Sequence, residues 1–333
     1  MNFLKTKILF RCDLGDINEL GSGHLYRCIT IARFLKLKFK LRFEDIIFVI
    51  KTKKKYSKSS KLIKRFNFKF VSINYEIKDY SIREKNILSK FGGKLIIIDR
   101  LGRINKSFII NGLKNFEKKL IIDDSSSYRR LFDLSYNPLI TNVKKVKKNF
   151  IGINNFISPI YFYKKNKVKT KSGIFVFFGG YDKKNLLRKI FKNINYSPEL
   201  KFYFPEVYKK NIKKLKIKNR MYFFKENEYY KYLEKSKFAI LSAGMSVFDA
   251  LYLEKKIICI PQYKHQLNNL YFNKIQNNLI LLKNNERNFT KKFLFVFNQL
   301  LNKKNTIVKK RLFSKKNMNI TLYRIAKLIR NDK

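Results

Sequence analysis

The sequence predicts two α/β domains, each built on a parallel β-sheet, with a ligand site in the cleft between them. Three observations support this prediction. Short apolar runs alternate with amphipathic segments along most of the chain. The run Leu-Ile-Ile-Ile at 95–98 shows no polar alternation, as expected for a strand covered on both faces. The length of 333 residues exceeds what one compact core usually holds.

The first half contains five expected strands with helical patterns between them. The strands cover residues 7–10, 46–50, 68–73, 95–99 and 120–123, and the helices fall near 24–37, 57–66, 76–90 and 104–117. Asp99 and Asp123 close two of the apolar runs. Because open α/β sheets bind ligands at the carboxyl ends of their strands, both carboxylates are expected at that edge.

The second half repeats this alternation. Strands are expected at 173–178, 201–204, 238–242 and 257–261, and helices near 183–193, 206–214, 227–235, 246–254 and 264–276. A polar stretch at 163–171 separates domain 1–162 from domain 172–318. The segment 319–333 carries a helical pattern and is expected to pack back across the cleft, with an amphipathic helix on a membrane surface as the alternative.

The composition leaves two interpretations of the charge open. The formal net charge of +53 is typical of a surface for nucleic acid, anionic lipid or phosphorylated ligands. Alternatively, it reflects drift toward A/T-rich codons, since Lys, Asn, Ile, Phe and Tyr are all abundant. The lysines are spread along the whole chain without one stripe, which favours drift and makes nucleic acid an unexpected partner.

Cysteine usage and hydropathy indicate a cytoplasmic protein. Cys12, Cys28 and Cys259 lie far apart without metal-ligand spacing and are expected to be reduced. No apolar segment reaches the roughly 18 residues of a membrane span, and no signal-peptide pattern precedes the first strand. The motifs of metal, nucleotide-loop and dinucleotide sites are missing from the sequence, so neither a catalytic metal nor a cofactor is expected.

A glycine-rich turn leads into one of the two histidines. Gly21-Ser22-Gly23 precedes His24 where the first helix is expected to start. Glycines allow a tight turn and close approach of a ligand. The free amides of a first helical turn disfavour imidazolium, so His24 is expected to be neutral and able to act as a general base. A capping or packing histidine is the open alternative.

Two strand–turn–helix motifs in the second half suit a nucleotide. Gly179-Gly180 lets backbone amides face an anion beside a helix N-terminus. Asp249 lies one turn inside the helix that follows Ser242-Ala243-Gly244, where its carboxylate could accept both hydroxyls of a ribose or simply favour the helix dipole. His265, the second histidine, is expected in a surface loop.

Taken together, the motifs resemble one enzyme family. In chain order they are Arg11-Cys12-Asp13, Gly21-Ser22-Gly23-His24-x-x-Arg27-Cys28, Phe178-Gly179-Gly180-x-Asp182, Ala243-Gly244…Asp249-Ala250-Leu251 and Pro261…Gln266. They resemble the pseudaminic acid pathway hydrolases, which act on UDP-2,4-diacetamido-2,4,6-trideoxy-β-L-altropyranose. That family is related to MurG-type glycosyltransferases and to spore-coat polysaccharide proteins.

The resemblance implies a GT-B-like fold, in which two Rossmann-like domains face an interdomain cleft. It implies metal-independent hydrolysis of a UDP-sugar to free sugar and UDP, with His24 as the base that activates water and Asp13 orienting the imidazole or the water. Contacts to substrate or nucleotide are implied for Arg11, Gly21, Gly23, Gly179, Gly180, Asp182, Gly244, Ser246, Asp249 and Gln266. The alternatives are a glycosyltransferase of the same fold and a basic nucleic-acid-binding protein.

Overall fold

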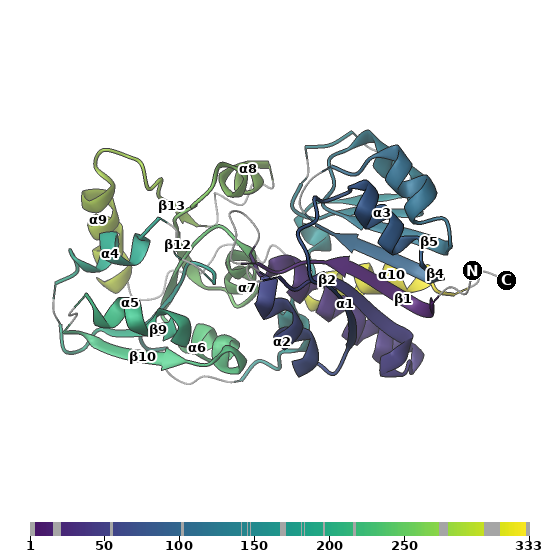
Figure 1. The fold of residues 1–333 in the computed structure, drawn as a ribbon. Coiled ribbons are helices and arrows are strands. Elements are labelled where there is room, and N and C mark those ends of the chain that lie inside the picture. Colours follow the sequence, from purple (N-terminus) through teal and green to yellow (C-terminus); the bar gives the residue numbers. More distant parts are fainter. Residues whose placement is uncertain are drawn as a thin grey trace. The chain divides into compact units, whose positions relative to one another are not determined.

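The computed structural model divides the chain into two compact units. It describes residues 4–15, 21–53, 56–100, 103–140, 142–144, 146, 148–166, 171–180, 182, 184–195, 197–215, 218–272, 279–302 and 314–330. The first unit comprises Met1–Tyr161 together with Phe313–Lys333, and the second comprises Phe162–Leu312. Each unit contains one sheet whose paired strands all run parallel (Figure 1).

The sheet of the first unit has seven strands in the order β3-β2-β1-β4-β5-β6-β7. Their bounds are β1 Leu4–Cys12, β2 Ile46–Lys51, β3 Lys69–Ile73, β4 Phe91–Asp99, β5 Phe116–Ile122, β6 Leu134–Asn137 and β7 Asn149–Ile151. The chain builds outward from β1 to β3 and then returns to the other side of β1 with β4. This reversal creates a topological switch point between β1 and β4, where such sheets bind ligands.

Helix α1, Gly23–Phe39, connects β1 to β2 and presents an apolar stripe to the sheet. Leu25, Cys28, Ile29, Ala32 and Leu35 recur at helical spacing and are all buried. The helix ends at Lys40, which adopts the left-handed conformation (φ 50°) that commonly terminates helices. This packing fixes the first turn of α1 beside the carboxyl end of β1.

The remaining helices of the first unit are short. They are α2 Ser57–Arg65, α3 Ile82–Leu88 and α10 Lys315–Lys327. The helix expected near 104–117 is only a π-helical turn, Phe108–Gly112, because β5 already begins at Phe116. Strands β6 and β7 escaped prediction because they have only four and three residues.

The sheet of the second unit has six strands in the order β10-β9-β8-β11-β12-β13, so its switch point lies between β8 and β11. The strands are β8 Ile174–Phe177, β9 Lys201–Pro205, β10 Arg220–Phe224, β11 Phe238–Leu241, β12 Lys256–Cys259 and β13 Ile280–Leu281. The helices are α4 Leu186–Phe191, α5 Lys209–Lys213, α6 Tyr229–Lys235, α7 Met245–Tyr252, α8 Lys264–Phe272 and α9 Phe289–Asn302. Its core is rich in Phe, including Phe202, Phe204, Phe293 and Phe297.

The C-terminal helix α10 packs within the first unit, where Figure 1 shows it in yellow among the purple and blue elements. Met318, Leu322 and Ile325 are wholly buried at i, i+4 and i+7 spacing. Tyr161 donates a hydrogen bond from its hydroxyl to Asn319 Oδ1 at 2.8 Å. The structural boundary between the units therefore lies at 161/162, with α10 returning to the first unit. None of the described helices is long and apolar enough to cross a membrane.

We predict that the buried face of α10 stabilises the first unit. Leu322→Ala should lower the free energy of unfolding by about 2–5 kcal/mol, since it leaves a cavity under the helix. Ile320→Ala, a matched change on the exposed side of the same helix, should cost less than about 0.5 kcal/mol. Urea unfolding followed by circular dichroism measures both. Equal losses of unfolding free energy in the two variants would show that the buried Leu322 stabilises the unit no more than the exposed Ile320 does.

Candidate active site

His24 lies at the switch point of the first sheet, in the first turn of α1. Its Nδ1 atom is 2.6 Å from Oδ1 of Asp99, the last residue of β4. The Asp99 side chain is wholly buried, whereas the His24 side chain keeps 16% of its surface exposed. Strand pairing explains this contact. Asp99 lies opposite Cys12, the last residue of β1, and α1 is the element that follows β1 in the chain.

Arg27 fixes Asp99 from the next turn of α1. Its Nε donates to Asp99 Oδ2 at 2.7 Å and its Nη2 donates to Oδ1 at 2.8 Å, a bidentate pair. The third nitrogen, Nη1, donates to Asp123 Oδ2 at 2.6 Å. The other oxygen of Asp123 accepts from the backbone N–H groups of Leu139 and Ile140 at 3.0 and 3.1 Å. The result is a buried chain of partners that runs from His24 through Asp99 and Arg27 to Asp123.

The charges of these hydrogen-bonded residues determine which tautomer a neutral His24 adopts. Burial alone would raise the pKa of Asp99, but the charge of Arg27 and the hydrogen bonds from His24 and Arg27 outweigh it and lower the pKa to about 2. Asp99 is therefore ionised at neutral pH and can only accept hydrogen bonds. The proton of a neutral His24 must then sit on Nδ1, which leaves the lone pair on Nε2.

A second buried polar cluster is centred on Arg11 of β1, the strand that pairs with β4. Arg11 donates from Nε to Glu84 Oε1 at 2.6 Å and from Nη1 to Asp13 Oδ1 at 2.7 Å. Arg100 also binds Glu84, and the backbone N–H of Lys51 donates to Asp13 at 2.8 Å. The charge of Arg11 holds the pKa of Asp13 below its usual value, although burial opposes this. Opposite charges thus compensate one another inside the cluster.

The structure pairs Asp13 with Arg11 and gives the imidazole of His24 a different carboxylate. The carboxylate that hydrogen bonds the imidazole is Asp99, whereas Asp13 binds Arg11. Strand alternation gives the reason, because Arg11 lies opposite Ile98 and its side chain points away from the sheet face that carries Cys12 and Asp99. Arg11 has no exposed surface, and its described contacts are all with the protein framework.

The glycine-rich turn before His24 is open at Gly21. A Cβ added to Gly21 would meet nothing within 4 Å among the described atoms, and Gly21 itself is exposed. Gly23 is the first residue of α1, and the N-cap Ser22 makes no side-chain capping bond. With no acidic residue in its first turn, α1 presents the positive end of its dipole beside the exposed side of His24.

In the second unit, the loop after β8 is held by side chains from two other segments. Tyr208 accepts from the Phe178 N–H at 2.8 Å and donates to the Gly179 carbonyl at 2.6 Å. Gln262 donates from Nε2 to the Phe178 carbonyl at 2.8 Å. Gly179 has a φ of +87°, which favours glycine. A Cβ added at Gly180 would meet nothing within 4 Å in the described structure.

Asp182 caps a helix. Its two oxygens accept from the backbone N–H groups of Leu186 and Leu187 at 2.9 and 2.8 Å, at the start of α4. Burial raises its pKa despite these bonds. The contacts of Asp182 therefore shape the loop that was predicted to lie near a diphosphate, and its oxygens already have donors.

Helix α7 begins at the carboxyl end of β11 with an open N-terminus. Its N-cap is Gly244, which provides no side-chain cap, and its first turn contains no acidic residue. Ser246 and Asp249 are both buried in the helix at 5% exposure. The hydroxyl of Tyr230 lies 3.5 Å from Asp249 Oδ2. The α7 N-terminus and the glycine loop after β8 thus flank the switch point of the second sheet.

Two polar residues of α8 have defined partners. Gln266 accepts at Oε1 from the Gln262 N–H at 2.9 Å, so it supports the residue that fixes the β8 loop. His265 lies in the first turn of α8, where its ring stacks on Tyr263 at 5.5 Å between centroids, and not in a surface loop as expected. Within the described residues, no group of three or more His, Cys, Asp and Glu gathers as metal ligands would.

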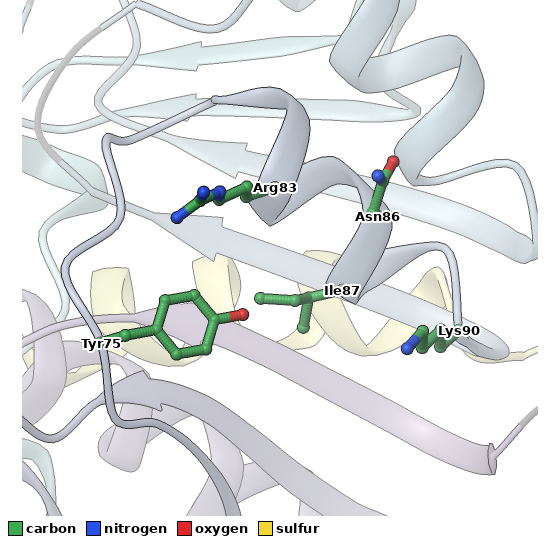
Figure 2. Close-up of a pocket in the computed structure, with 5 residues that line it drawn as sticks. All are labelled: Tyr75, Arg83, Asn86, Ile87 and Lys90. Atoms are coloured by element: carbon green, nitrogen blue, oxygen red, sulfur yellow. The ribbon is translucent and has the colours of Figure 1, made fainter.

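A cavity of about 470 Å³ lies apart from these clusters, on α3. Figure 2 shows its lining residues, which are Tyr75, Arg83, Asn86, Ile87 and Lys90. None of them belongs to the hydrogen-bonded series from His24 to Asp123 or to the cluster around Arg11. The cavity therefore offers no acid–base pair for chemistry.

Sequence reasoning missed several members of these clusters. The sequence marks Asp99 and Asp123 as strand ends and Arg27 as part of a motif, but it does not indicate that they bind one another. The i, i+3 spacing of His24 and Arg27 places both on one helix face and could have indicated a shared partner. Nothing in the sequence pattern pointed to Glu84 or Arg100.

Comparison with known proteins establishes the fold. No protein-family model matches the chain, and no curated protein sequence matches it. MurG of Acinetobacter baumannii superposes with a TM-score of 0.59 at 10% identity, covering 97% of this chain and 99% of MurG. S. aureus MnaA with UDP gives 0.54 at 12% identity, covering 90% and 88%. The UDP-GlcNAc 2-epimerase from Neisseria meningitidis bound to UDP-GlcNAc gives 0.53 at 11%, covering 98% and 99%. The predicted class, two Rossmann-like parallel-sheet domains of GT-B type, is confirmed.

We predict an acid-dependent loss of stability that originates at Asp99. Because its folded-state pKa is lowered, the folded state binds fewer protons than the unfolded state between about pH 4 and pH 2. The contribution of ionised Asp99 to the free energy of unfolding is complete above about pH 4 and disappears as the pH falls through about 2. A lowering from 3.8 to about 2 corresponds to about 2 kcal/mol.

Urea unfolding of the wild type and Asp99→Asn between pH 2 and pH 6 measures this contribution. The stability difference between the two proteins should shrink by about 2 kcal/mol toward the acid end. A difference that stays constant with pH would show that Asp99 has an ordinary pKa in the folded state.

Proposed function

We propose that this chain is a nucleotide-sugar hydrolase that cleaves a UDP-linked diacetamido-trideoxy sugar into free sugar and UDP, as in pseudaminic acid biosynthesis. The observation that carries the proposal is the arrangement of His24, Asp99 and Arg27. It leaves the partly exposed imidazole with Nε2 unbonded to any described residue and with Nδ1 tied to an ionised carboxylate. Such a histidine suits general-base catalysis.

In the proposed step, His24 Nε2 takes a proton from water while the water oxygen attacks the anomeric carbon. The bond from that carbon to the diphosphate oxygen breaks, and UDP leaves with the electron pair. Asp99 stabilises the imidazolium that forms, since its negative charge lies 2.6 Å from Nδ1. The proton then passes to solvent. Direct attack inverts the anomeric configuration, and general-base catalysis of this kind is worth roughly 10²–10⁴ in rate.

We assign the nucleotide to the switch point of the second unit. A diphosphate suits the open N-terminus of α7, which has no acidic residue in its first turn, and Gly180, where an added Cβ would meet nothing within 4 Å in the described structure. Asp249 in α7 is the candidate acceptor for ribose hydroxyls. Two of the similar solved structures hold UDP or UDP-GlcNAc, which supports this class of ligand.

The competing proposal is glycosyl transfer. The same histidine could deprotonate an acceptor hydroxyl in place of water, and MurG and the spinosyn rhamnosyltransferase SpnG are among the similar structures. The resemblance of Gly21-Ser22-Gly23-His24-x-x-Arg27 to the hydrolase motif favours water. The two reactions differ in whether turnover needs an acceptor.

We predict that the purified protein releases UDP from the diacetamido-trideoxy sugar nucleotide in buffer alone. In water enriched in ¹⁸O, the label should appear in the sugar and not in UDP, because attack occurs at the anomeric carbon. His24→Ala should lower turnover by about 10²–10⁴ while UDP binding by calorimetry stays within about twofold. Release that requires an added acceptor would identify a transferase, and full activity of His24→Ala would remove the base from the proposal.

We also predict that the glycines of the second unit serve ligand approach and not stability. Gly180→Ala and Gly244→Ala place a methyl group in open space at negative or extended φ, so the melting temperature should change little. Each methyl group would meet a bound diphosphate and should weaken UDP binding about tenfold or more, which is 1.4 kcal/mol or more. Gly152→Ala is the control for a glycine with open space away from the switch point, although its positive φ adds strain. Unchanged UDP affinity in both variants would move the nucleotide elsewhere.

A further inference from the structure

The exposed sides of α1 and α10 form one continuous surface in the first unit. The ring of Tyr323 on α10 packs edge-on against Phe34 of α1 at 5.3 Å between centroids. Lys38, in the last turn of α1, lies with Nζ 4.6 Å from the centre of the Tyr323 ring and 3.5 Å from its hydroxyl. We call this surface the α1–α10 face.

The α1–α10 face carries positive charge without compensation. Neither α1 nor α10 contains Asp or Glu. In the described part of the chain, none of the exposed cations of this face takes part in an ion pair. Those cations are Lys38 on α1 and Lys315, Lys316, Arg324 and Lys327 on α10. Some exposed cations elsewhere do pair with acids, as Lys292 does with Glu286 at 2.6 Å.

Apolar side chains stand exposed among these cations. Leu37 at the end of α1 is 68% exposed, and Ile320 and Tyr323 on α10 are 44% and 41% exposed. Arg324 covers the ring of Phe150 at 4.4 Å, which holds a cation against an aromatic surface. Cations alone would suit any polyanion. Exposed aliphatic side chains gain nothing from phosphates, but they gain free energy by entering the acyl boundary of a bilayer.

From this combination we propose that the α1–α10 face docks on an anionic lipid bilayer, with Leu37, Ile320 and Tyr323 at the depth of the lipid headgroups and below. A cluster of four to eight Lys and Arg on an amphipathic helix is the pattern that anionic lipids attract. The phenol ring of Tyr323 suits the interface because one end is apolar and the other polar. The proposal is independent of the chemistry at His24.

The chain has no tryptophan, so a single introduced indole reports on this face. Tyr323→Trp is compared with Tyr222→Trp on β10, whose parent tyrosine is equally exposed at 41%. Vesicles contain phosphatidylcholine alone or equal parts of phosphatidylcholine and phosphatidylglycerol. Only Tyr323→Trp with anionic vesicles should show a blue shift and quenching by brominated acyl chains. Failure to bind anionic vesicles, or the same response from Tyr222→Trp, would overturn the proposal.

A matched pair of charge variants separates this face from the total charge of +53. The first removes four cations from α10: Lys315→Gln, Lys316→Gln, Arg324→Gln and Lys327→Gln. The second removes four exposed lysines at α5: Lys209→Gln, Lys210→Gln, Lys213→Gln and Lys214→Gln. Partition onto anionic vesicles should weaken about 100-fold in the first and less than about threefold in the second.

Equal weakening in the two variants would mean that overall charge governs binding, and the proposal would fail. Binding of a homopolymeric RNA to the same variants is the remaining measurement. If the α10 variant loses RNA binding while brominated lipids leave the introduced indole unquenched, the face binds nucleic acid and not a bilayer. Circular dichroism of each variant confirms that the comparison is made between folded proteins.

Discussion

The pairing of Arg27 with Asp99 is the interaction on which the candidate site depends. A carboxylate with no exposed surface at the end of a central strand would be protonated or would destabilise the fold if it had no cation. Arg27 supplies that cation in bidentate geometry, and Asp123 fixes its remaining donor. Because Arg27 and His24 lie on the same face of α1, the helix that neutralises Asp99 also presents the imidazole to it.

Two buried polar clusters occupy opposite faces of the same pair of strands, β1 and β4. Arg11, Asp13, Glu84 and Arg100 lie on one side, and the chain from His24 to Asp123 lies on the other. The clusters share backbone but no side-chain partner among the described contacts. Each cluster therefore pairs its own opposite charges. The loss of either would be felt mainly at the carboxyl edge of the sheet.

The sequence predicted much of the fold because parallel strands covered on both faces leave an unmistakable apolar run, as at 95–98. It failed at β6, β7 and β13, which are too short to show a period, and at the five-residue β10, which was not predicted. It also failed at 104–117, where a strand cut a helical pattern short. His24 could be selected because histidine is rare and glycines precede it. Its partner could not, because Asp99 is 75 residues away and only the register of β1 with β4 brings the two together.

Helix α1 carries both the candidate base and part of the α1–α10 face, since His24 is in its first turn and Lys38 in its last. At 1.5 Å per residue, the 14 steps between them span about 21 Å along the helix axis. A rigid helix therefore fixes the distance between these two residues. With the α1–α10 face on a bilayer, the imidazole would be held within about 21 Å, along α1, of the lipid-facing Lys38. If the proposed hydrolysis takes place at His24, its products form at that distance from the membrane.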